Sequence, residues 1–297
     1  MFKTSTTIKD KITIAAFYIL IFMFSMFCLF PFIIAISGSF SSEVGVTSKG
    51  FSILPRDFTV DTFRYIFDNL GFMIGNAYKM TISTTVLGTL LSVFITVCYS
   101  YVVSVKDFRH GNKFAFFAYF TMLFNGGMLP WYLVCTQYLG LKNSLAALIL
   151  PYSINVFYMY LQRNFFKSLP YELTESAQID GAGYLRIFIQ IMLPLSKAGI
   201  VTITLFYALQ FWNDFYLPLM LVNDTELYTM QYILYKMMAN IQYLASNPNG
   251  TMSGHIILPA QTIKMAITCI AIGPIVLLYP FIQKYFVKGV TVGAIKG

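Results

Sequence analysis

Charged side chains are scarce in this 297-residue chain: Asp, Glu, Lys and Arg make up 11% of it, whereas hydrophobic residues make up 57%. A soluble globular domain carries about 25% charged residues, because its surface faces water. With less than half of that share, the chain cannot cover a soluble globule with polar side chains. Soluble α/β, disordered and collagen-like classes are therefore excluded, and the mean hydropathy of +0.68 predicts an integral membrane protein.

The chain also lacks the usual parts of a catalytic, nucleotide or metal site. No Gly-Lys dipeptide occurs, so the Gly-x-x-x-x-Gly-Lys-Ser/Thr phosphate loop is absent. The four cysteines form no Cys-x-x-Cys pair and lie in apolar runs, which indicates buried small hydrophobic residues. No Ser/His/Asp arrangement is visible either. We therefore expect no enzyme activity and no metal or cofactor bound by this chain.

Acidic residues are fewer than basic ones, 12 against 20, which gives a net charge of +8. In a soluble protein this excess would point to nucleic acid. In a membrane protein it is explained by Lys and Arg on the cytoplasmic flanks of the spans. We expect no nucleic-acid partner.

Six continuously apolar runs predict six transmembrane helices in an all-α fold, since a span needs about 20 residues to cross about 30 Å of hydrocarbon. Strands of a membrane barrel would alternate apolar and polar residues instead. The first run is too long for a signal-peptide core of about 7–15 residues; cleavage near Ala35 is the alternative. The runs are 12–36, 80–105, 114–139, 144–161, 198–222 and 259–282. Residues 37–79 and 223–258 are expected as long outer segments.

Basic residues are distributed unevenly over the two sides that these spans define. Thirteen lie on the side of the termini and six on the other, so the positive-inside rule predicts that both termini are cytoplasmic in a multi-pass protein of the plasma membrane. The thirteen are Lys3, Lys9, Lys11, Lys106, Arg109, Lys113, Arg163, Lys167, Arg186, Lys197, Lys284, Lys288 and Lys296; the six are Lys49, Arg56, Arg64, Lys79, Lys142 and Lys236.

A patterned cytoplasmic segment, about 168–195, follows the fourth run. Pro170 suits the first turn of a helix, where its missing N–H has no partner anyway. Glu172 and Glu175 favour the positive end of the helix dipole, and Gly181 interrupts the pattern. The segment predicts a short helix, a bend and a second helix. From spacing alone, an amphipathic hairpin that merely connects two spans is an equal alternative.

The same segment resembles the EAA loop of binding-protein-dependent ABC importer permeases, with Ser176 in place of the first Ala. The matching residues are Glu175-Ser176-Ala177, Asp180-Gly181-Ala182 and Leu193-Pro194. Residues 124–130, 161–166, 211–214 and 283–289 are similar to the carbohydrate-importer subfamily, above all to the maltose-type second permease subunit.

The resemblance implies a type I ABC importer permease fold with a single transmembrane domain over 1–297. It implies a sugar as the cargo, and this subfamily points to an oligosaccharide. It implies that the 168–195 segment is a coupling helix seated in a cytoplasmic ATPase, and that the tail at about 284–297 reaches the ATPases. The implied coupling residues are Glu172, Glu175, Ser176, Ala177, Asp180, Gly181 and Ala182.

The resemblance also implies partners. These are a second permease subunit in a heterodimer, two ATP-binding subunits, an extracytoplasmic sugar-binding protein and membrane lipids. ATP and Mg would be used by the ATPase and not by this chain.

One polar cluster falls inside the fifth run. Asp214 is the one acid that we place within a span, and an ionisable residue there is a functional hypothesis by default. With Trp212 and Asn213 it offers the aromatic face and hydrogen-bonding groups that a sugar path requires. The alternative is a polar cluster that fixes helix packing. In the third run, 125–127 with Pro130 should bend or unwind the helix.

The leading functional prediction is a permease subunit that forms half of a sugar path and couples to a separate ATPase. An ion-coupled secondary transporter is the alternative; it would need paired repeats with intramembrane carboxylates or broken helices. A membrane-embedded enzyme is third, since no catalytic cluster is visible.

Overall fold

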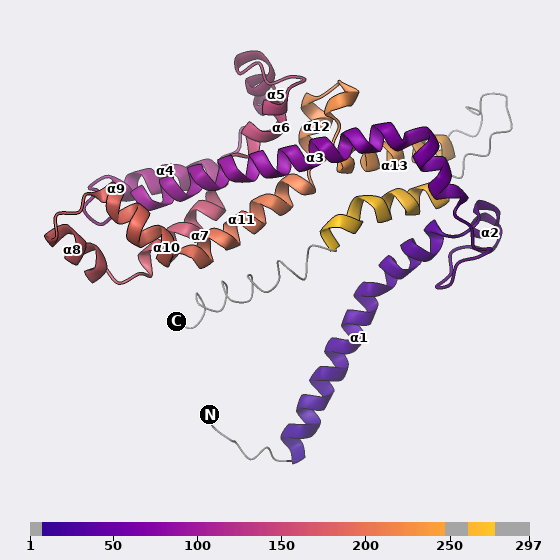
Figure 1. Cartoon of the computed structure of the whole chain (residues 1–297), viewed down its shortest axis with the longest axis horizontal. Helices are drawn as coiled ribbons and strands as arrows, with labels where there is room; N and C mark the ends of the chain where they lie inside the picture. The colour runs from indigo at the N-terminus through magenta and orange to yellow at the C-terminus, as the bar shows by residue number, and fades with distance from the viewer. Residues whose placement is uncertain (1–7, 247–260, 277–297) are drawn as a thin grey trace. The chain divides into compact units, whose positions relative to one another are not determined.

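A computed structural model describes residues 8–246 and 261–276 of the chain, and all its regular elements in this range are helices. Three expectations lie outside the described residues: the tail at 284–297, the last part of the outer segment 223–258 from residue 247 on, and both ends of the sixth run. The chain forms two compact units, Met1–Gly71 with Met237–Gly273 and Phe72–Lys236 with Pro274–Gly297. Each unit is described by itself (Figure 1).

The first unit begins with a long apolar helix, α1 (Ile8–Ser39), which confirms the first predicted run. No residue in its most apolar stretch is buried within this chain. Cys28 on this helix is therefore exposed, contrary to the expectation that all four cysteines are buried; Cys135 is buried as expected. The expectation failed because a single chain does not cover this helix, so its surface is left to lipid or to another subunit.

A carboxylate joins two segments of the first unit that are far apart in sequence. Glu43 starts α2 (Glu43–Lys49) and accepts hydrogen bonds from the backbone N–H groups of Gln261 at 3.1 Å and Thr262 at 2.9 Å. The first N–H groups of a helix have no intrahelical partner, and negative charge there is stabilising. Glu43 thus caps the helix Gln261–Val276.

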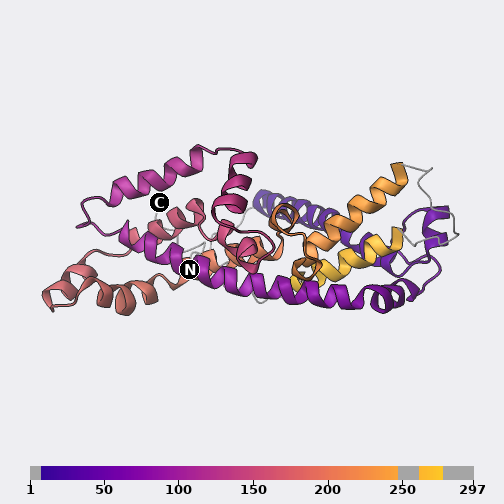
Figure 2. The ribbon, with the colours of Figure 1, turned by 90° about the horizontal axis from the view of Figure 1, so that it is seen from above.

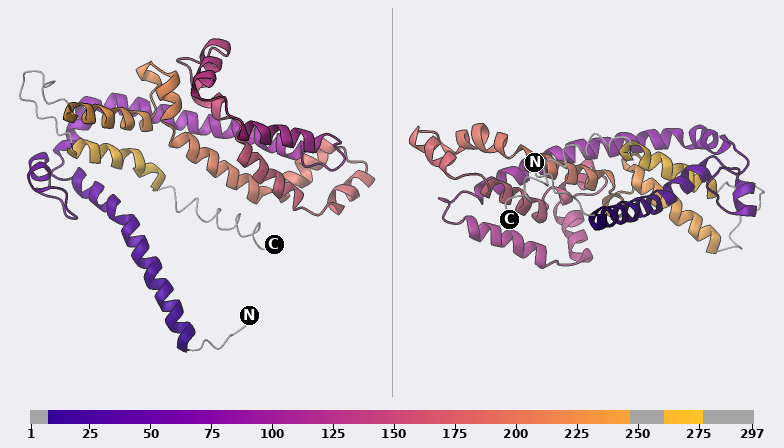
Figure 3. Two further views of the ribbon diagram at one scale, coloured as in Figure 1. Left: turned by 180° about the vertical axis from the view of Figure 1, so that it is seen from behind. Right: turned by 90° about the horizontal axis from the view of Figure 1, so that it is seen from below.

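The core of the second unit is formed by three helices that run side by side (Figures 1 and 3): the part of α3 (Asp61–Val102) from Phe72 on, α7 (Val156–Lys167) and α11 (Lys197–Trp212). Small and hydroxyl residues of α3 face the other two helices. Thr96 shares a hydrogen bond of 2.7 Å with the Tyr207 hydroxyl, and Ser100 donates to the Met159 carbonyl at 2.9 Å. Small residues allow close helix approach in a bilayer, where hydrophobic exclusion from water does not drive association.

The third and fourth predicted runs are broken helices. The third consists of α4 (Gly111–Leu123), a non-helical stretch, α5 (Met128–Leu133) and one π turn. Gly127 has φ +89° in that stretch, so the predicted unwinding at 125–127 is confirmed. The fourth run consists of α6 (Leu145–Ile149), a 3₁₀ turn and α7, which are bent by 53°.

Several boundaries differ from the predicted ones. α3 begins at Asp61, so the second half of the expected outer segment 37–79 is helix, and α13 (Met230–Ser246) occupies much of 223–258 (Figure 2). α7 continues beyond 161 to Lys167. The predictions followed hydropathy, whereas a helix continues as long as its backbone groups remain paired, including where its residues are polar.

The number of spans is not fixed by length and hydropathy in the described residues. Two helices, Asp10–Ser39 and Asp61–Val102, are long and apolar enough to cross a membrane. The count rises to four if each bent pair is one span, the second pair being Tyr184–Leu195 with Lys197–Trp212 at 78°. Six spans and a single transmembrane domain stay predictions.

Candidate functional site

The 168–195 segment folds as a helix, a turn and a second helix, as predicted. It consists of α8 (Glu172–Ile179), α9 (Tyr184–Ile187), a π turn (Phe188–Met192) and α10 (Leu193–Leu195). Gly181 closes α8 with φ +78°, a conformation that favours glycine. The N–H of the next residue, Ala182, donates back to the Ala177 carbonyl at 2.9 Å. Pro170 lies before α8 and not in its first turn, because α8 begins at Glu172.

The predicted coupling residues lie together on this helix and turn. Glu172, Glu175, Ser176, Asp180 and Gly181 are exposed, whereas Ala177 and Ala182 are half-buried. In the part of the chain that the structure describes, no Lys or Arg forms an ion pair with either glutamate. The acidic groups are therefore accessible to an external cation.

Two large apolar side chains that are not among the predicted coupling residues lie among these acids. Ile179, at the end of α8, is 86% exposed, and Leu185, on α9, is 70% exposed. Exposed apolar groups rimmed by polar ones mark interaction surfaces with protein or membrane. The sequence signal for both is an apolar residue close to the predicted bend at Gly181. We call these two residues and the exposed acids the coupling surface.

A single carboxylate in the loop after α3 holds this segment. Asp107 accepts hydrogen bonds from the Tyr171 hydroxyl at 3.3 Å, the Gln178 side-chain amide at 3.4 Å and the Tyr184 hydroxyl at 3.1 Å. Desolvation and the neighbouring Asp107 charge raise the pKa of the Tyr171 hydroxyl. The neighbouring Lys106 ammonium lies 3.8 Å from the centre of the Tyr171 ring. Sequence reasoning missed Asp107.

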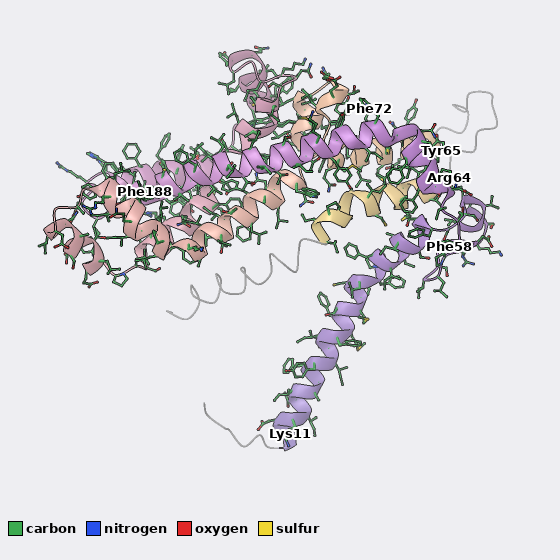
Figure 4. All side chains as sticks on the ribbon, viewed as in Figure 1. Lys11, Phe58, Arg64, Tyr65, Phe72 and Phe188 are labelled. Atoms are coloured by element: carbon green, nitrogen blue, oxygen red, sulfur yellow. The ribbon has the colours of Figure 1, made fainter. Side chains whose placement is uncertain are left out.

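The second half of the segment is attached to α3 by an aromatic residue. Tyr101 donates from its hydroxyl to the Tyr184 carbonyl at 3.1 Å, and its ring stacks on Phe188 with 4.6 Å between centroids. Figure 4 labels Phe188 at this end of the unit. A cavity of about 440 Å³, lined in part by Tyr101, Phe166 and Tyr171, separates the start of α8 from the membrane helices. The hydrogen bonds to Asp107 hold the first half beside this cavity.

The three residues predicted for the sugar path follow one another at the end of α11 but do not form one surface. Trp212 and Asp214 are buried, whereas Asn213 is exposed and its amide donates to the Leu209 carbonyl at 2.8 Å. The expected span does not continue through them: α11 ends at Trp212, and α12 (Tyr216–Leu221) is a separate helix.

The carboxylate of Asp214 is occupied within the chain. It accepts hydrogen bonds from the N–H of Tyr216 at 3.0 Å and of Leu217 at 3.3 Å, and it bonds the Tyr152 hydroxyl. It therefore caps the broken helix, which favours the packing alternative for this residue. The role of the three residues in a sugar path stays a prediction.

Known proteins resemble the chain over almost its whole length. Residues 11–292 match the family of binding-protein-dependent transport system inner membrane components. The chain belongs to this family. The protein is therefore a component of a membrane transporter and not an enzyme, and the ion-coupled alternative loses its support.

Two relatives and one solved structure are similar to this chain in sequence or in fold. The chain is 39% identical over 292 residues to the polygalacturonan/rhamnogalacturonan transport system permease protein YtcP of Bacillus subtilis (strain 168), which covers 97% of this chain and 100% of the relative. It is 39% identical over 269 residues to protein LplC of the same organism. That match covers 91% of this chain and 90% of LplC. A chain in the crystal structure of a bacterial ABC transporter that imports the acidic polysaccharide alginate is 28% identical, with a TM-score of 0.81 over 96% of this chain and 100% of that one.

These matches confirm the family that the EAA-like motif indicated, and they confirm a helical fold similar to that of type I ABC importer permeases. An inner membrane component of this family is a multi-pass protein of the plasma membrane. The family also implies a partner permease, ATP-binding subunits and a substrate-binding protein.

Proposed function

We propose that this chain is the permease subunit of an ATP-driven oligosaccharide importer. It forms half of the translocation path, with a second permease as the other half. Two of the matches support an oligosaccharide cargo: YtcP is named as a polygalacturonan/rhamnogalacturonan transport system permease, and the solved structure is of a transporter involved in the import of alginate. Two ATP-binding subunits use ATP and Mg, and an extracytoplasmic protein delivers the sugar.

The observation that carries the proposal is the coupling surface. It combines accessible carboxylates with exposed Ile179 and Leu185 on a compact element held at Asp107. Such an element suits a cleft in an ATPase, because acids pair with Arg or Lys and the apolar groups are buried on docking. In this orientation the 168–195 segment, both termini and the 284–297 tail face the cytoplasm, and the chain crosses the membrane six times.

Purification of the complex after Glu175→Ala tests the proposal, with Glu226→Ala as the control because Glu226 is also exposed but lies outside the segment. Breaking a buried charge pair costs about 3–5 kcal/mol, whereas an exposed pair is worth about 0–1. We expect Glu175→Ala to weaken retention of the ATPase, or substrate-stimulated hydrolysis, by more than tenfold. If neither variant changes either quantity, the segment is only a connector between spans.

The sugar path needs its own test. Trp212→Ala should lower uptake of the sugar while assembly and basal ATP hydrolysis persist. Unchanged uptake at all sugar concentrations would assign Trp212 and Asp214 to helix packing.

A further inference from the structure

A small basic pocket lies beside the coupling segment, where α3, α4 and α7 end or begin. It has a volume of about 260 Å³, and its charged lining residues are Lys106, Arg109 and Lys167. Ser104 and Asn112 add polar groups. No acidic side chain lines this pocket.

A fourth cation stands next to the pocket. Arg163 on α7 is only 9% exposed; its Nε donates to the Val103 carbonyl at 3.1 Å and its guanidinium donates to the Asn112 side chain at 2.9 Å. Among the described residues, neither Arg163 nor Lys167 forms an ion pair. Asp107, which follows Lys106 in the chain, has its carboxylate occupied by the tyrosines of the coupling segment. Four cations thus gather around one cavity without a carboxylate partner.

An apolar groove adjoins the basic pocket. Its volume is about 450 Å³, and it follows the last turns of α3 from Phe94 through Cys98 to Val102, with Phe114 of α4 on its other side. Val103 and Phe108 line both the groove and the pocket. The Tyr99 hydroxyl in the groove donates a hydrogen bond to the Phe114 carbonyl at 3.0 Å, so the surface that the groove offers to a ligand is apolar.

We propose that the pocket and the groove together bind one anionic phospholipid. The phosphate lies among Lys106, Arg109 and Lys167, and an acyl chain lies along the groove. Basic pockets at the cytoplasmic ends of membrane helices suit such headgroups, and each nearby Lys or Arg contributes about 1 kcal/mol. A free phosphate would use the cations but not the groove. An acidic side chain of the ATPase would likewise leave the groove empty.

The site also lies against the anchoring point of the coupling segment. Lys106 lines the pocket and lies over the ring of Tyr171. An anion bound there is therefore close to Tyr171, the residue that precedes α8.

Native mass spectrometry of the whole transporter, released from nanodiscs that contain equal amounts of phosphatidylglycerol and phosphatidylcholine, tests the proposal. The charge variant is Arg109→Ala with Lys167→Ala; both side chains are exposed and neither anchors the coupling segment. Lys113→Ala is the matched control, since Lys113 lies on the same loop-helix junction but outside the pocket. We expect phosphatidylglycerol retention to fall about fivefold for each cation removed and about twenty-five-fold for both. The control should retain it fully.

A second variant separates a lipid from a free anion. Val102→Trp partly fills the groove from a position that is 47% exposed, so it needs no repacking of the core. It should lower phosphatidylglycerol retention although all four cations remain, and inorganic phosphate should not displace the lipid. If inorganic phosphate displaces phosphatidylglycerol and Val102→Trp retains the lipid fully, the pocket is an anion site only. If the charge variant loses the ATPase but retains phosphatidylglycerol fully, the pocket is an ATPase contact. Either result overturns the proposal, and neither depends on whether the transporter carries sugar.

Discussion

The Tyr184 hydroxyl donates a hydrogen bond of 3.1 Å to the Asp107 carboxylate, across 77 residues of sequence. The same carboxylate bonds Tyr171, which precedes α8, so one acid in the loop after α3 holds both ends of the α8 turn. In the complex that we propose, a force exerted by the ATPase on α8 would reach α3 through these polar contacts. This arrangement gives the coupling surface a defined attachment to a membrane helix.

Replacing the anchor should uncouple hydrolysis from transport. Asp107→Ala removes the acceptor for three donors, and we expect substrate-stimulated ATP hydrolysis to fall about fivefold, the lower end of typical couplings of about 1–3 kcal/mol between sites. ATPase retention should persist, because the coupling surface itself is intact. Asp68→Ala, at another exposed acid, is the control. Unchanged stimulation in Asp107→Ala would mean that Tyr101 alone suffices as the attachment.

The turn after α8 should depend on one of its two glycines. A Cβ at Gly181 or at Gly183 meets no atom within 4 Å, but only Gly181 has a positive φ, +78°. Gly181→Ala should therefore strain the turn by about 1–2 kcal/mol, displace the coupling surface and weaken ATPase retention. Gly183→Ala, with φ −72°, should not. A pulldown measures ATPase retention in both variants. Equal retention would contradict the need for a left-handed conformation at residue 181.

Close packing of α3 on α11 predicts a difference between two glycines of the same helix. A Cβ at Gly88 would lie 2.7 Å from the Phe211 ring, whereas one at Gly75 meets no atom within 4 Å. Gly88→Val should destabilise the protein by about 1–3 kcal/mol through overpacking, and Gly75→Val should change stability little. The midpoint of thermal unfolding in detergent measures both. Similar midpoints would show that the two helices separate more easily than this contact suggests.

The topology has a direct chemical test. Cysteines introduced in place of Lys3, Lys296 and Lys142 into a variant without the native cysteines should react differently with an impermeant maleimide in intact cells. We expect Lys142→Cys to be labelled and the two terminal positions to be protected until the membrane is opened, because thirteen of the bases are predicted on the terminal side. Labelling of all three in intact cells would contradict cytoplasmic termini.

The sequence by itself determined the features that depend on local chemistry. Scarce charge required a membrane protein, Gly127 required a break in the third run, and the acids and Gly181 specified a helix, a bend and a second helix. Each of these follows from a few neighbouring residues, since backbone freedom and helix-end electrostatics act over one or two turns.

Only the tertiary structure decided the features that depend on residues far apart in the chain. Hydropathy placed Asp214 inside a span, whereas the fold uses its carboxylate to cap a separate helix and bonds it to Tyr152. Asp107 looked like an ordinary loop acid, and its role exists because the fold brings Tyr171 and Tyr184 to it. No periodicity encodes such pairings: a hydrogen bond needs two groups at about 3 Å, and their separation in sequence is set by how the helices pack.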